Sequence, residues 1–265
     1  MSSSTGDPAA PTAPLTSQSA VPPADLAQAY DRERAERVRA EAAVFERDQM
    51  LSILSHDLRG PLNAIHSWSH VLERKVDLSD PGVQRALGGV RTGVEQQVRL
   101  IEEVVDATRQ ATRHLQIARR PVELSALLPT VVANVRDTVG RARNVSIGEQ
   151  PMSAPQQAEF DAERVWQAVW VMLDYGVTRT ASHGSIAIDS AAGSGNWTVL
   201  VEFTAEDNEA APMRADQLPP ALTLPLRVAE AHGGHLTMIR NEGAAFAQQL
   251  RLSLPLFAPP QVSKV

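Results

Sequence analysis

A long run without glycine or proline constrains this chain more than any other feature. From about Asp25 to Gly60 the sequence is rich in Ala, Glu, Arg and Leu, which are strong helix formers. The run predicts one long helix. Because the apolar pattern continues through Trp68, we expect Pro61 to kink this helix rather than end it. Apolar residues at spacings of three, four and seven predict a seam packed in a helical bundle: Leu51, Leu54, Leu58, Leu62, Ile65 and Leu72.

A second helix is expected after a short turn. Residues 75–82 (KVDLSDPG) combine turn-forming residues with Pro81 at the first helical position, and Ser79 or Asp80 is the predicted N-cap. The short connection predicts an antiparallel hairpin. One hairpin leaves a wide apolar face uncovered, so we expect two copies of the chain to form a four-helix bundle. The second helix repeats the seam at Val83, Leu87, Val90, Val94, Ile101, Val104 and Thr108.

After about residue 118 the sequence mixes strand and helix patterns, so the predicted fold class is α+β. A helical hairpin that forms a dimeric four-helix bundle is followed by a two-layer α/β sandwich. Helices are expected at 122–139, at 161–180 and up to His232, and strands at 144–148, 184–189, 196–203, 235–239 and 246–254. The predicted domains are a disordered tail (1–23), the hairpin with an N-terminal coiled coil (24–117), the α/β domain (118–257) and a tail (258–265).

Composition excludes several classes of function. The 265 residues include 31 acidic and 25 basic side chains, and the net charge of −6 disfavours nucleic acid as the main partner. There is no cysteine, which excludes disulfides, thiolate zinc sites and a cysteine nucleophile. His183, His232 and His235 have no matched acidic ligands, so no metal site is expected. No segment is long and apolar enough to span a bilayer, and we expect a cytoplasmic protein.

Two further groups of side chains are interpreted as structural. Trp166, Trp170 and Trp197 lack the basic surround of a base-stacking platform and are expected to fill an aliphatic core. Near the N-terminus, basic and acidic residues alternate and predict a solvated coiled-coil face. These residues are Asp31, Arg32, Glu33, Arg34, Glu36, Arg37, Arg39 and Glu41.

One histidine is predicted to face solvent. At 100° per residue, His56 lies about 160° from the seam at Leu58, on the outer face with Ser52 and Asn63. Taken alone, such a histidine is usually an ordinary surface residue. Its neighbour Asp57 can orient the ring or accept its proton, which leaves a neutral nitrogen able to attack phosphorus. Arg59 is placed to contact phosphate oxygens.

The segment 55–65 (SHDLRGPLNAI) resembles the H box of the dimerisation and histidine-phosphotransfer domain of two-component histidine kinases. The resemblance extends over the hairpin, from about Phe45 to Arg109. It implies that His56 accepts the phosphoryl group and that Asp57 helps to activate it. Many relatives have Thr or Asn four residues after the histidine, which positions a water for dephosphorylation of the response regulator. Here that position is Gly60, so phosphatase activity of this type is not expected.

The remainder resembles the ATP-binding domain that follows the hairpin in these kinases, a fold shared with gyrase and heat-shock chaperone ATPases. Residues 161–167 (DAERVWQ) look like the start of its nucleotide-facing helix. Residues 230–236 (EAHGGHL) look like a helix-to-strand junction, and 252–256 (LSLPL) like its closing strand.

Between these segments the family's ATP-binding residues are replaced. The resemblance places Tyr175 where an asparagine holds Mg²⁺, with Asp174 as the nearest substitute. Phe203 falls where an aspartate reads adenine, and Pro219-Pro220 falls in a glycine motif, although proline lacks the N–H that binds phosphate. No cofactor is therefore expected. The intervening loop adds like charges at Glu206, Asp207 and Glu209.

The leading interpretation is a dimeric phosphorelay protein. His56 exchanges a phosphoryl group with an aspartate of a response-regulator receiver domain, which supplies the Mg²⁺, and the degenerate domain serves for docking. Two alternatives remain open. One is an ATP-dependent sensor histidine kinase that autophosphorylates on His56. The other is a non-catalytic regulator whose hairpin pairs with a partner histidine kinase.

Overall fold

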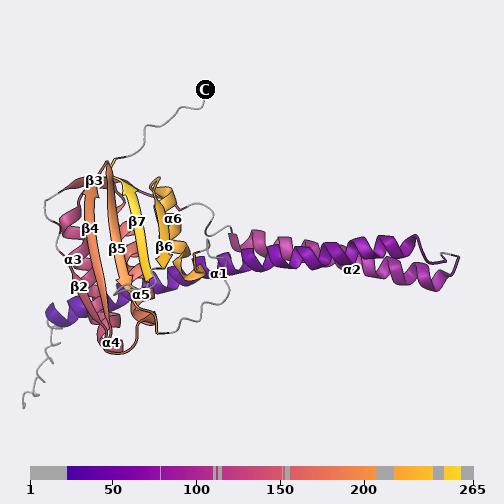
Figure 1. Cartoon of the computed structure of the whole chain (residues 1–265), viewed down its shortest axis with the longest axis horizontal. Helices are drawn as coiled ribbons and strands as arrows, with labels where there is room; N and C mark the ends of the chain where they lie inside the picture. Colours follow the sequence, from indigo (N-terminus) through magenta and orange to yellow (C-terminus); the bar gives the residue numbers. More distant parts are fainter. Residues whose placement is uncertain are drawn as a thin grey trace, which may run out of the picture.

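A computed structural model describes residues 23–77, 79–109, 112, 115–150, 152, 156–206, 218–240 and 248–257. The predicted tails, apart from Pro23, and the loop residues Asp207 and Glu209 lie outside these residues. The described part has two regions, a helical hairpin and an α/β domain, and the hairpin projects from the domain as a rod (Figure 1).

The hairpin consists of helices α1 (Pro23–Glu73) and α2 (Pro81–Arg109). Helix α1 runs through Pro61 without ending, as predicted. Asp80 accepts a hydrogen bond from the backbone N–H of Gly82 at 2.6 Å, so Asp80 caps α2 and Pro81 is its first residue. Among the described residues, no helix is long and apolar enough to cross a membrane.

The α/β domain begins with strand β1 (Arg120–Glu123), which pairs with β3 (Gln157–Phe160) in a small antiparallel sheet. A second sheet has the order β2-β4-β5-β7-β6. Its strands are β2 (Ser146–Glu149), β4 (Ser185–Gly193), β5 (Asn196–Phe203), β6 (His235–Arg240) and β7 (Gln248–Pro255). The helical segments are α3 (Leu124–Val135), η1 (Arg136–Gly140), α4 (Arg141–Arg143), α5 (Ala162–Arg179), η2 (Pro220–Leu222) and α6 (Thr223–Ala231).

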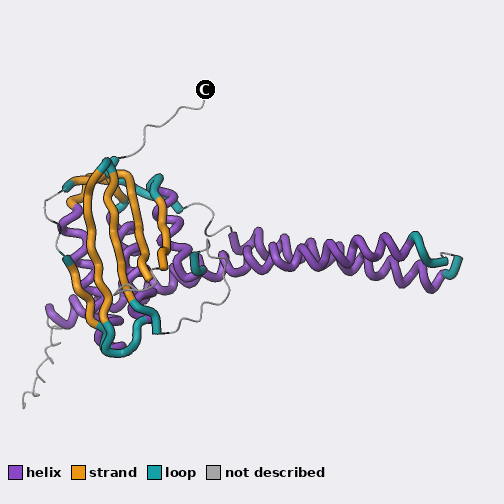
Figure 2. The backbone as a smooth tube through the Cα atoms, viewed as in Figure 1, coloured by secondary structure: helices purple, strands orange, loops and turns teal. Residues whose placement is uncertain are grey.

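The helices cover one face of the large sheet, as Figure 2 shows, and the two layers enclose the core. Alternate residues of β5 point inward, as the period of two in a strand requires. Trp166, Trp170 and Trp197 are all buried, which confirms their predicted role in the core. A helical hairpin followed by this two-layer domain confirms the predicted α+β class.

The N-terminal half of α1 packs against this domain, so the predicted solvated face is right for only part of the charged run. Asp31, Arg34 and Glu41 are half-buried, whereas the other five residues are exposed: Arg32, Glu33, Glu36, Arg37 and Arg39. Ala35, Val38 and Phe45 are at most 4% exposed and belong to the domain's core cluster. The charged residues around them pair with α5: Arg34 with Glu163 at 2.6 Å, Arg39 with Asp174 at 3.1 Å, and Glu41 with Arg164. The alternation of charges was real, but part of it borders an intramolecular contact.

Several strand and helix limits differ from the predicted ones: β2 begins at Ser146 rather than at residue 144, and β4 continues to Gly193 rather than ending at residue 189. Val122 lies in β1, and the helix expected to begin there starts at Leu124. Strand β3 was not predicted, because its four residues are too few to show a clear alternation.

Candidate functional site

His56 lies on the surface of α1, as its position on the helical wheel predicted. Its side chain is 81% exposed and that of Asp57 is 70% exposed. The Nδ1 atom of His56 is 3.3 Å from Oδ1 of Asp57. When Nδ1 carries the proton and donates it to this carboxylate, Nε2 is left with a free lone pair directed to solvent. The pair therefore presents a nucleophilic nitrogen beside a proton acceptor.

The other predicted site residues surround this pair unevenly. Arg59 is half-exposed, and its guanidinium is 3.5 Å from the carboxylate of Glu102 on α2. Asn63 is exposed, whereas Ser52 is half-buried. At Gly60 an added Cβ would meet no atom within 4 Å. The surface one turn after His56 is therefore open, and the packing within the chain does not require glycine there.

The α/β domain packs on the same side of α1 that carries His56. Val38, which is buried against the domain, precedes His56 by 18 residues, or about five turns of helix. The two side chains therefore point in nearly the same direction, about 27 Å apart along the helix axis. The apolar seam faces away from this side. Leu54, Leu58 and Ile65 remain 46–54% exposed in the single chain.

A buried polar contact that was not predicted from the sequence ties α1 to the domain. Asn134 of α3 is 4% exposed. Its amide donates to the backbone oxygen of Asp31 at 3.0 Å and accepts from Nε1 of Trp170 at 2.8 Å. One side chain thus joins α1, α3 and α5. The available signal was the one amide side chain in the mostly apolar segment 124–135 (LSALLPTVVANV), since buried amides need partners.

His232 joins two segments that resemble the family's ATP-binding domain, residues 161–167 and 230–236. Asp161 caps α5 by accepting from the N–H of Arg164 at 3.1 Å. The His232 ring is fully buried, its Nδ1 is 2.8 Å from the Val228 oxygen, and its Nε2 accepts from the Asp161 N–H at 3.1 Å. These contacts fix the neutral ring with its proton on Nδ1. Burial, reinforced by the nearby Arg119, lowers the pKa of His232 below its usual value of 6.5 despite opposing contributions from Val228 and Asp161.

Aromatic side chains occupy the positions where the resemblance placed magnesium and adenine ligands. Tyr175 is 6% exposed and Phe203 is fully buried, and their rings meet edge to face at 5.9 Å. The Arg179 guanidinium lies over the Tyr175 ring at 4.5 Å. The nearest carboxylate in sequence, that of Asp174, pairs with Arg39 of α1. Neither aromatic ring offers the compact oxygen that Mg²⁺ prefers.

The proline pair at the expected glycine motif forms a tight turn rather than an open loop. Pro219 accepts a hydrogen bond from the N–H of Leu222 at 2.8 Å, and η2 leads directly into α6. This segment packs against α1. Its backbone N–H groups are therefore fewer than in a glycine turn, and one of them is already engaged.

Comparison with known proteins agrees with this arrangement. Residues 46–113 match the family model of the His Kinase A (phospho-acceptor) domain. The chain is 26% identical over 147 residues to the adaptive-response sensory kinase SasA of Synechocystis sp. (strain PCC 6803), an alignment that covers 54% of this chain and 38% of that protein. It is 22% identical over 212 residues to the aerobic respiration control sensor protein ArcB of Escherichia coli K12, covering 79% of this chain and 26% of ArcB.

A solved structure matches both regions. The crystal structure of a histidine kinase from Burkholderia phymatum STM815 superimposes with a TM-score of 0.65 and 29% sequence identity, over 85% of this chain and 99% of that one. The chain thus spans well under half of the two curated relatives but nearly all of this solved structure.

A phospho-acceptor hairpin joined to an ATP-binding fold of the kinase type defines a histidine-kinase-like signalling protein. The chain belongs to the two-component sensor histidine kinase family.

Proposed function

We propose that this protein is a phosphorelay component in which His56 carries a phosphoryl group exchanged with the aspartate of a response-regulator receiver domain. The observation that carries the proposal is the exposed His56–Asp57 pair on a phospho-acceptor hairpin. A receiver must bring its phosphoaspartate to the histidine, and an imidazole that is 81% exposed leaves room for such a partner.

The transfer balances with the groups present. Nε2 of His56 attacks the phosphorus, the P–N bond forms, and the P–O bond to the receiver aspartate breaks to release its carboxylate. The imidazolium that results carries its proton on Nδ1, where Asp57 stabilises or accepts it. In the reverse direction the receiver aspartate attacks phosphohistidine and the same proton returns to the ring. The receiver contributes the Mg²⁺ that neutralises the transferring phosphoryl group.

The proposed active form is a homodimer. The seam residues Leu54, Leu58, Ile65 and Leu72 are about half exposed in one chain, which is more uncovered apolar surface than a hairpin in water normally keeps. The α/β domain packs on the opposite side of α1, so a second hairpin meets no obstacle from it. This arrangement supports a four-helix bundle with His56 on its outer surface.

The α/β domain is proposed to act as a docking surface. It shares the His56 side of α1, so a receiver that reaches His56 also lies near the domain. Its residues do not fit a magnesium–nucleotide complex, because Tyr175 and Phe203 replace oxygen ligands and pack on each other. The proposed reaction therefore contains no step that uses ATP.

Labelling of variants tests the phosphoryl acceptor. The full chain is incubated with a phosphorylated receiver, and His56→Gln is expected to lose all transferred label. His70→Gln is the matched control, because His70 lies on the same helix and is 48% exposed. Retention of acid-labile label in the His56→Gln chain would contradict the proposed acceptor.

A second candidate is ATP-dependent autophosphorylation of His56. The similarity over the whole length of the Burkholderia histidine kinase favours it. Calorimetric titration with Mg-ATP separates the two, since loss of three charge-assisted contacts is expected to weaken a micromolar site to beyond about a millimolar. Tighter binding, together with direct labelling of His56 by ATP, would favour the kinase. If neither ATP nor a receiver labels the chain, a non-catalytic regulator of a partner kinase is the better description.

A further inference from the structure

Trp68 is the most exposed large apolar side chain of the hairpin. It is 66% exposed, although it lies within α1, five residues before that helix ends. It follows Leu58 by ten residues and therefore lies about 80° from the centre of the seam, on the side of α1 that faces away from α2. Met50, which is 50% exposed, lies on the same line. An exposed indole of this size needs a partner surface.

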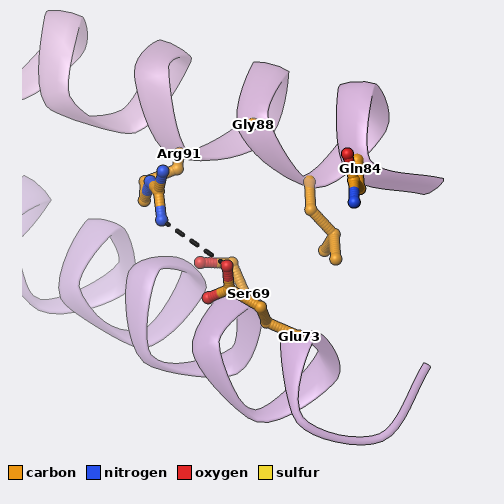
Figure 3. A pocket seen from close by; sticks show the side chains of 6 residues that line it. Ser69, Glu73, Gln84, Gly88 and Arg91 are labelled. Carbon is orange, nitrogen blue, oxygen red and sulfur yellow. Dashed lines mark ion pairs between the residues drawn. The ribbon is translucent and has the colours of Figure 1, made fainter. Parts of the chain in front are cut away.

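Two ion pairs show which residues of α1 and α2 lie at the same height along the axis of the hairpin. Arg59 pairs with Glu102 at 3.5 Å, and Glu73 pairs with Arg91 at 3.8 Å. Figure 3 shows the second pair beside the pocket of about 240 Å³ between the helices. Since both helices rise equally per residue, the first pair places Trp68 level with Gly93 on α2 and the second places it level with Gln96, three residues away. Gly93 therefore lies within one turn of the level of Trp68.

Gly93 offers a depression on the outer side of α2. Val94 and Val105 are 8% exposed and face α1. Gly93 precedes Val94 by one residue and so points about 100° away from that contact. A Cβ added to Gly93 would meet no atom within 4 Å. A glycine here weakens the helix relative to alanine, and packing within the chain does not require it.

A two-fold axis parallel to the helices brings these features together. In an up-down bundle the two α1 helices are parallel and lie on a diagonal, so α1 of one chain neighbours α2 of the other at the same level. We propose that Trp68 of one chain packs over Gly93 of the second copy, and that this contact selects the chain's own copy as its dimer partner. The inference rests on the homodimer proposed above.

Neighbouring levels show the same complementarity of size. Counted from the Arg59–Glu102 pair, Ala64 lies level with Gln97, and Pro61 lies level with the half-exposed Leu100. The largest residue of α1 thus meets the smallest of α2, and small residues of α1 meet larger ones. A partner kinase with a bulky residue at the Gly93 position would clash with Trp68, which excludes it from mixed dimers.

Dimer dissociation constants of full-length variants test the contact. Trp68→Ala and Gly93→Leu are each expected to weaken the dimer by about tenfold or more. The double variant Trp68→Ala/Gly93→Leu is expected to recover most of the loss, because leucine fills the space left by the indole. Gly60→Leu is the matched control, since Gly60 is also an open glycine inside a helix but lies away from the seam. Circular dichroism checks that each variant keeps its helices.

The outcomes distinguish this contact from dimerisation itself. If Trp68→Ala or Gly93→Leu leaves the dimer dissociation constant unchanged, the proposed Trp68–Gly93 contact is wrong, but the proposed homodimer is not contradicted. Weakening by both single changes without recovery in the double variant would also overturn direct packing. A folded wild-type chain that stays monomeric at micromolar concentration would refute the homodimer and, with it, this inference.

Discussion

Phe45→Ala is expected to destabilise the α/β domain, although Phe45 lies on the helix that also forms the hairpin. Phe45 is 4% exposed and belongs to the core cluster of the domain. Truncation of a buried phenylalanine costs about 3–5 kcal/mol, because transfer free energy is lost and a cavity remains. In a folding unit of this size, 1 kcal/mol shifts the melting temperature by about 2–4 °C, so the expected drop is at least about 6 °C.

Chemical denaturation followed by tryptophan fluorescence measures this effect, because Trp166 and Trp170 lie in the same core. The matched control is Leu26→Ala on the same helix. Leu26 is 65% exposed, so its truncation should change the free energy of unfolding by less than about 0.5 kcal/mol. Equal effects of the two substitutions would show that the N-terminal half of α1 does not pack on the domain in solution.

Three further predictions concern single side chains. The pKa of His232 is lower in the folded state than its unfolded value of about 6.5, so the unfolded state binds the extra proton. The contribution of His232 to the free energy of unfolding should therefore be constant above about pH 6.5 and fall as the pH is lowered below that value. Between about pH 7.5 and 5.5 the urea midpoint should fall more for the wild type than for His232→Gln. Equal changes of the midpoint with pH in the two proteins would exclude His232 as the cause. Asn134→Ala should cost about 1–3 kcal/mol in thermal unfolding, because the Trp170 N–H loses its buried acceptor, and a neutral result would mean that water or another acceptor replaces the amide. Gly60→Ala should stabilise α1 by up to about 1 kcal/mol, since its Cβ meets open space. A lower melting temperature would indicate that the backbone before Pro61 needs glycine.

Local signals predicted much of the fold. The helix from Asp161 to Thr180 was recognised because an N-cap and the apolar period lie within the segment itself, and the structure has α5 at Ala162–Arg179. The hairpin turn at Asp80-Pro81 was found for the same reason. Strand β3 was missed because its partner β1 is about 40 residues away in sequence, and a four-residue strand has little pattern of its own.

Some features of the candidate site also follow from local sequence, whereas others depend on contacts between distant segments. The exposure of His56 and the proximity of Asp57 follow from helical period and adjacency, which are both local. The docking of Arg34 and Arg39 on α5 could not be predicted, because an arginine beside glutamates looks equally suited to solvent and to a distant acid. The burial of Val38 and Phe45 depends on which side of α1 the later domain occupies, and no segment of the helix specifies that alone.

Helix α1 fixes the direction of the His56 side chain, around the helix axis, relative to the side on which the α/β domain packs. It is continuous over 51 residues, about 75 Å, and each residue inserted between Phe45 and His56 would rotate the histidine by about 100° relative to the domain. One inserted residue would turn His56 away from the domain's side of the helix. Seven inserted residues, close to two full turns, would nearly restore the direction while lengthening the spacing by about 10 Å. One continuous helix therefore holds the α/β domain and His56 at a fixed angle to each other, and only insertions or deletions of nearly whole turns of α1 preserve that angle.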